Sequence, residues 1–160
     1  MRGWPGRRRA DERRSETKRV RDAQAGEYEG AMAVVRQSLA ELDVARAHRS
    51  EIVVPVVLRA AHERIDGALA RAAAAATAVY DALFEAAGGT YHAESDPDVA
   101  LWKRHMNNAL TLRSQHQMSQ LDDEVAMLGP PLVGAYARTR AAFGPQQAGL
   151  DFDVHLDASV

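Results

Sequence analysis

The sequence contains no cysteine. This absence excludes disulfides, thiolate zinc sites, iron–sulfur clusters and thiol catalysis. Aromatic residues are also few, at 6% of the chain, and only two of the 20 basic residues, Lys18 and Lys103, are lysines. The arginine bias is accompanied by abundant alanine, which is typical of a GC-rich coding genome and says little about function.

Long apolar runs are missing as well. The two longest, "IVVPVVL" and "ALARAAAAATAVY", are too short or too rich in alanine to span a bilayer. A composition with 46% hydrophobic and 26% charged residues is typical of a soluble globular protein of one domain. We therefore expect no membrane partner, and a location in the cytoplasm or within a larger assembly such as a virion.

Catalytic and cofactor motifs are absent from the sequence. It contains no G-x-G-x-x-G, no G-x-x-x-x-G-K, no H-E-x-x-H, no G-x-S-x-G and no EF-hand loop. The Glu-x-x-His pair of di-iron helical proteins does not occur either. We predict a protein that is not an enzyme and that has no cofactor, no metal site and no small-molecule substrate.

The charge is distributed unevenly along the chain. Residues 1–21 hold nine bases and three acids, a charge of +6, so the remaining residues carry −8 within a net charge of −2. We predict that residues 1–9 form an irregular basic arm. The candidate contacts to an anionic partner are Arg7, Arg8, Arg9, Arg13 and Arg14.

Two interpretations of this basic region stay open. Its arginines can neutralise nucleic-acid phosphates while Trp4 stacks on a base. Alternatively, because acids alternate with bases at helical spacing, the region is a solvated helix face or docks to an acidic protein surface. We favour the second interpretation, since one aromatic residue is few for a nucleic-acid reader.

The clearest secondary-structure signal is a helix from about Ala10. Its large apolar residues recur at steps of 4, 3, 4 and 3, which is the spacing of a coiled-coil seam. They are Tyr28, Met32, Val35, Leu39 and Leu42. Before Gly26 the only large apolar residue of the helix is Val20, so this half is predicted to project as a charged, solvated extension.

Three further helices are predicted from their start and stop signals. The second either begins near Val54 or bends there, because Pro55 lacks an amide hydrogen, and it stops at Gly88–Gly89. The third runs from an N-cap at Asp96 to Leu128, and its apolar stripe fades across "RSQHQ". A short fourth spans about 131–143.

These signals define the expected fold class. We predict an all-α protein in which residues 10–144 form an elongated antiparallel bundle of three long helices plus one short helix. Residues 145–160 are predicted to form an extended acidic and apolar docking tail.

Histidines and acids give weak signals. His62 and Asp66 lie one helical turn apart, and His105 and His116 lie three turns apart, spacings that suit metal ligands. Further ligands at matching offsets are lacking, so we interpret these histidines as ordinary surface or boundary residues. We interpret the acidic cluster 122–124 as solvated.

The tail contains "LDFDVHLD", in which apolar and polar residues alternate as in a β-strand. A metal site is disfavoured because residues on one side of a strand lie about 7 Å apart. Either the segment adds a strand to another molecule's sheet, or it lies in a groove of its own bundle. The candidate docking residues are Leu150, Phe152, Val154 and Leu156.

Large apolar residues are sparse for so much helix surface, which indicates that homo- or hetero-oligomeric protein partners supply more. We therefore expect a non-enzymatic structural or protein–protein interaction component of a larger oligomeric assembly, with a virion or phage component as one example. The alternative is a nucleic-acid-associated protein that binds phosphates through the basic arm. A small metal-dependent enzyme ranks third.

Overall fold

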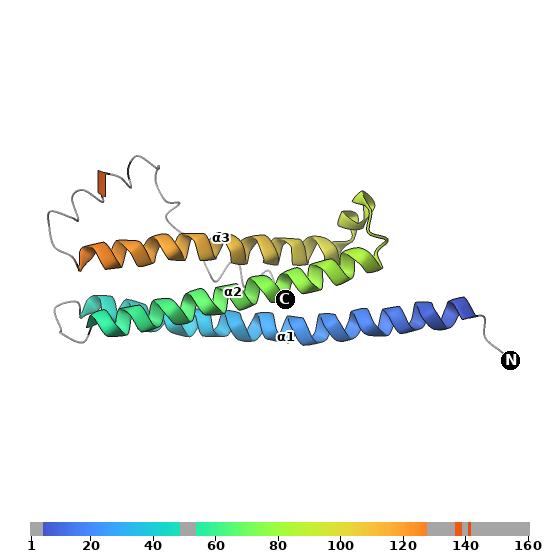
Figure 1. Ribbon diagram of the computed structural model, residues 1–160, viewed down its shortest axis with the longest axis horizontal. Helices are drawn as coiled ribbons and strands as arrows, with labels where there is room; N and C mark the ends of the chain where they lie inside the picture. The colour runs from blue at the N-terminus through green and yellow to red at the C-terminus, as the bar shows by residue number, and fades with distance from the viewer. Residues whose placement is uncertain (1–4, 49–53, 128–136, 139–140, 142–160) are drawn as a thin grey trace.

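The computed structural model describes residues 5–48, 54–127, 137–138 and 141 (Figure 1). Within these residues the protein is all-helical and contains no strand, which confirms the all-α part of the predicted fold class. Three long helices and one short 3-10 helix follow in the order α1 (Pro5–Ala47), α2 (Val54–Ala86), η1 (Tyr91–Ser95) and α3 (Pro97–Ala126). In the part of the chain that is described, no helix is long and apolar enough to cross a membrane.

Helix α1 begins earlier than its sequence suggests. It starts at Pro5 and not near Ala10, so the prediction of an irregular conformation is wrong for residues 5–9. Proline suits a first helical turn because its φ is already near the helical value and its missing N–H would have no partner there. With 43 residues, α1 is about 65 Å long.

Helix α2 has the first of its two predicted starts, and it has the predicted end. It starts at Val54, with Pro55 in its first turn. It ends where Gly88 and Gly89 take φ values of 107° and 63°, a region that glycine enters without steric cost. The amide of Gly89 donates to the carbonyl of Phe84 at 2.9 Å, as in the glycine-terminated ends of many helices.

Helix α3 starts as predicted. The Asp96 side chain accepts a 2.8 Å hydrogen bond from the Asp98 amide, and Pro97 is the first helical residue. The helix ends at Ala126, two residues before the predicted end. The predicted fourth helix and the tail lie outside the described residues, apart from 137–138 and 141, which are helical.

Ion pairs show how consecutive helices lie against each other. Arg64 pairs with Glu41, and Arg71, one heptad further along α2, pairs with Glu27 earlier in α1. The chain therefore reverses direction between α1 and α2. It reverses again into α3, because Arg59 near the start of α2 meets Glu124 near the end of α3 (Figure 1).

The core follows heptad stripes on all three helices. On α1 the predicted seam residues pack together, with four of them buried and Leu39 partly buried. Alanines form much of the buried face of α2, including Ala68, Ala72 and Ala76, none of which has solvent-exposed surface. Small residues at these positions let the helices approach closely.

Candidate functional site

Two regions of the molecule carry more charge or polarity than a helical core requires. The first is the basic segment, defined as residues 5–27 of α1. From Gly6 to Glu27 this segment has no buried residue, and Tyr28 is the first buried residue of the helix. As predicted, half of α1 forms a charged, solvated extension.

The coiled-coil spacing of α1 continues through the basic segment, but its residue types change. Counting back from Tyr28 by alternate steps of three and four residues gives Ala25 and then mostly bases. The positions are Ala25, Arg21, Lys18, Arg14, Asp11 and Arg7. The stripe that packs the core in the second half of α1 is therefore a basic stripe in the first half.

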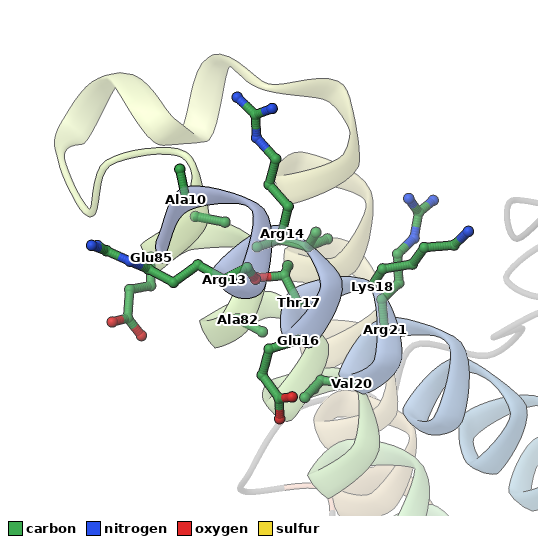
Figure 2. A pocket seen from close by; sticks show the side chains of 12 residues that line it. Ala10, Arg13, Arg14, Glu16, Thr17, Lys18, Val20, Arg21, Ala82 and Glu85 are labelled. Atoms are coloured by element: carbon green, nitrogen blue, oxygen red, sulfur yellow. The ribbon is translucent and has the colours of Figure 1, made fainter. Parts of the chain in front are cut away.

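A groove of about 730 Å³ lies between the basic segment and the end of α2. Ala82, Leu83 and Ala86 of α2 supply apolar surface, together with Val20 of α1. Figure 2 shows the basic side chains along α1 above this surface. The lining bases are Arg13, Arg14, Lys18 and Arg21, and the lining acids are Glu16 and Glu85.

Only some of the arginines predicted to contact an anionic partner line this groove. Arg13 and Arg14 line it, whereas Arg7, Arg8 and Arg9 lie on the exposed first turns of α1 and do not. Of the groove bases, Arg21 has an ion pair with Asp98 of α3, 3.5 Å from Nη1 to Oδ2. The predicted tail-docking residues, 150–156, lie outside the described residues.

The second region is the histidine cluster, which consists of Arg46, His62, His116, Ser119 and Asp123. His62 Nε2 lies 2.7 Å from Asp123 Oδ2, and His62 Nδ1 lies 3.0 Å from His116 Nε2. Arg46 donates from Nε and Nη2 to Asp123 Oδ2 at 3.1 and 2.9 Å. Arg46 Nη2 also lies 2.7 Å from Ser119 Oγ, so the cluster joins all three long helices.

The electrostatics of the cluster set the charges of His116 and Asp123. Burial, and then the nearby His62, lower the pKa of His116 to about 4. Burial pushes the pKa of Asp123 upward, but the hydrogen bonds from His62 and Arg46 outweigh it and bring this pKa to about 2. Asp123 is therefore ionised and accepts from His62 Nε2. His116 is neutral, and the tautomers of the two rings set the direction of the hydrogen bond between His62 Nδ1 and His116 Nε2.

A third histidine lies further along α3 in an aromatic setting. Tyr28 Oη is 3.3 Å from His105 Nδ1, and the Trp102 and His105 rings are 5.0 Å apart. Burial raises the pKa of Tyr28 to about 12 and lowers the pKa of His105. The Tyr28 hydroxyl is thus protonated, and the tautomer of His105 sets which of the two groups donates. His105 Nε2 is a buried polar atom without a hydrogen-bond partner among the described residues.

These findings correct the interpretation of the histidines. His62, His105 and His116 are 2%, 1% and 5% exposed, so the prediction of surface or boundary residues is wrong. Asp123, predicted to be solvated, is 4% exposed. In the described parts of the chain, no three histidine or acidic side chains are placed to hold one metal ion.

A signal for these buried residues exists in the sequence. From Trp102, steps of 3, 4, 3, 4, 3 and 4 along α3 pass through a continuous seam that includes polar residues. Its members are Trp102, His105, Ala109, Leu112, His116, Ser119 and Asp123. Counting large apolar residues alone instead selects Leu110 and Leu121, which are 49% and 48% exposed.

Together, fold and sites define an all-helical protein whose packed part has a seam interrupted by buried histidines and whose first helix continues outward as a basic stripe. Comparison of the chain with family models, with curated proteins and with solved structures finds no match.

Proposed function

We propose that this protein is a non-enzymatic structural or protein–protein interaction component of a larger oligomeric assembly, which docks through its termini. A virion or phage particle is one example, and the cytoplasm or such an assembly is the proposed location. The architecture proposed for this role is an elongated antiparallel bundle of three long helices, with a short fourth helix at about 131–143 and a docking tail.

The basic segment is the observation that carries this proposal. Isolated helices in water need favourable packing, because the entropy cost of ordering a short helix is barely recovered by its own hydrogen bonds. The segment holds about six helical turns, and from Gly6 to Glu27 none of its residues is fully buried, although Val20 and Ala25 are partly buried. A helix that extends so far from its core presents a surface on which a partner can pack.

The chemistry of the partner follows from the exposed charges. Arg7, Arg14, Lys18 and Arg21 lie on one stripe of α1, and Asp11 is the only acid among them. An acidic protein surface complements such a stripe and is guided to it by long-range attraction. The proposed partners are therefore homo- or hetero-oligomeric protein chains with acidic docking surfaces.

Light scattering on the intact chain tests the proposal. We expect a mass several times 17.4 kDa, or a comparable increase when an acidic partner is added. Reversing two stripe charges, Arg14→Glu with Lys18→Glu, is expected to lower that mass. The matched control reverses Arg36 and Arg104, which are exposed on the packed part of the molecule.

An unchanged mass in the control variant shows that the stripe, and not overall charge, drives association. A chain that stays monomeric at every concentration and with every partner candidate contradicts the proposal.

The same stripe supports a second candidate function, binding of nucleic-acid phosphates. Its bases recur at helical spacing, as phosphate-neutralising residues do when a helix lies along a nucleic-acid backbone. Retention of DNA or RNA that weakens steeply as salt rises, and that the Arg14→Glu, Lys18→Glu variant abolishes, supports this function. Retention that is independent of these residues excludes it.

A further inference from the structure

We propose that the segment 150–157 of this chain folds back within its own molecule and occupies the groove between the basic segment and the end of α2. This inference deepens the proposed function, on which it rests, because it names what covers the basic stripe before a partner does. The proposal depends on three features: matching chemistry, opposite charge and sufficient reach.

The groove and the segment 150–157 both have an apolar side and a charged side. The groove combines apolar surface from Val20, Leu83 and Ala82 with bases along α1 (Figure 2). When "LDFDVHLD" is extended, successive side chains point to opposite sides. One side of the extended segment is then entirely apolar and the other side is polar. The segment can therefore place its apolar side chains against the apolar surface of the groove and its acids near the bases of α1.

The charges are complementary. Residues 145–160 contain three acids, Asp151, Asp153 and Asp157, and no lysine or arginine. Four bases and two acids line the groove. No other stretch of the chain after α3 combines alternating apolar residues with this density of acids. Attraction between the two is therefore specific to this segment and weakens as salt screens it.

The connecting chain is long enough. Helix α3 ends beside the start of α2, where Glu124 pairs with Arg59, and the groove lies at the other end of α2 beside Leu83. The rise along α2 between Arg59 and Leu83 is about 36 Å. Residues 128–149 reach about 75 Å when extended, and about 50 Å when 131–143 are helical. Either length spans the distance.

The tether favours the molecule's own segment over that of a second copy. A flexible connection of this length holds its end at an effective concentration on the order of a millimolar. Micromolar protein in solution does not compete with that concentration. The groove is then occupied intramolecularly, and an acidic partner that docks on the basic stripe must displace the segment.

The absence of cysteine makes a direct test simple, since two engineered cysteines are the only thiols. We pair Ala86→Cys at the groove with Ala158→Cys beside the segment and join them with a short bismaleimide. The matched control pairs Ala158→Cys with Ala47→Cys, which is exposed at the opposite end of the molecule, near the end of α3. We expect cross-linking at Ala86 to be about tenfold faster, at monomer mass and independent of protein concentration.

A charge swap separates docking from chance proximity. Arg14→Glu with Lys18→Glu, or Asp151→Lys with Asp153→Lys, is expected to slow cross-linking at Ala86 roughly fivefold. Combining both pairs is expected to restore the rate. Reversing Arg36 and Arg104 should leave it unchanged.

Equal rates at Ala86 and Ala47 overturn the inference. A product of dimer mass that fades on dilution also overturns it, by identifying a second copy as the occupant. Light scattering keeps the two proposals distinct. An assembling chain with equal cross-linking rates loses only this inference, and a strict monomer with selective cross-linking loses only the proposed assembly.

Discussion

The two halves of α1 share one backbone and one heptad spacing, yet they have opposite surroundings. In the packed half the stripe is apolar, and Tyr28, Met32 and Val35 are each at most 2% exposed. In the basic segment the stripe bears the exposed Arg14 and Lys18, and from Gly6 to Glu27 no residue is fully buried. Tertiary packing of one half offsets the unfavourable free energy of helix nucleation. Each further residue that the helix then adds forms one more backbone hydrogen bond. Stability therefore resides in the packed half.

The packed part is itself not uniform. Heptad positions on α2 and α3 carry His62, His116 and Asp123 in place of apolar residues. Compared with apolar residues at the same positions, buried polar groups on a helix seam add little stability. They do disfavour any other alignment of the helices, because in that alignment their hydrogen bonds would not form. We interpret the histidine cluster as a device that fixes how the three helices align.

The largest effect should come from breaking this cluster. Asp123→Asn removes the carboxylate that Arg46 and His62 share, leaving a buried N–H and a guanidinium without their charged acceptor. We expect the free energy of unfolding in urea to fall by about 3–5 kcal/mol.

The neighbouring acid is the matched control. Glu124 forms an ion pair with Arg59, but both side chains are partly exposed, so Glu124→Gln should cost at most about 1 kcal/mol. Equal losses for the two variants would contradict the interpretation that the cluster is the special feature.

Next in size is a direct contrast within the α1 stripe. Met32→Ala removes a side chain that is 2% exposed and should destabilise the protein by about 2–5 kcal/mol. Arg14→Ala alters the same stripe where it is exposed and should change stability by less than about 0.5 kcal/mol. A large loss for Arg14→Ala in chemical denaturation would show that the basic segment is packed, contrary to the structure.

Acid should weaken the packed part over a defined range. The unfolded chain protonates His116 near pH 6.5, whereas the folded chain does so only near its lowered pKa of about 4. The unfolded state therefore binds more protons between these values, and stability falls from pH 6.5 to pH 4 by at most about 3 kcal/mol. His105, whose pKa is also lowered, adds to this loss.

Below pH 4 the lowered pKa of Asp123 extends the decline toward pH 2, because the unfolded carboxyl is then protonated first. Thermal melts across this range measure both steps. His116→Gln should flatten the step between pH 6.5 and pH 4, and His92→Gln, on exposed η1, should leave it intact.

The sequence predicted the three long helices, apart from the start of α1, but it did not predict the histidine cluster. The stop at Gly88–Gly89 and the cap at Asp96 are local signals, and both are confirmed. The heptad spacing of α3 indicates that Asp123 lies on the seam, but its pairing with His62 joins residues 61 positions apart, and no local pattern predicts that contact. Selecting the buried face of α3 from its large apolar residues alone is also wrong, because polar seam residues of this helix are buried while two of its leucines are exposed.

The smallest effect is expected where the two halves of α1 meet. The spacing of Gly26 and Gly30 allows a bend or a close helix crossing, but an added Cβ at either position meets no atom within 4 Å. Gly26→Ala and Gly30→Ala should therefore each stabilise the helix by about 0.5–1 kcal/mol, through lower entropy of the unfolded chain. Amide hydrogen exchange should then slow in the basic segment, because the helix propagates from the packed half into this segment through Gly26 and Gly30. Unchanged exchange there would mean that the segment opens independently of the packed half, and its helicity would then need a source other than propagation from the core.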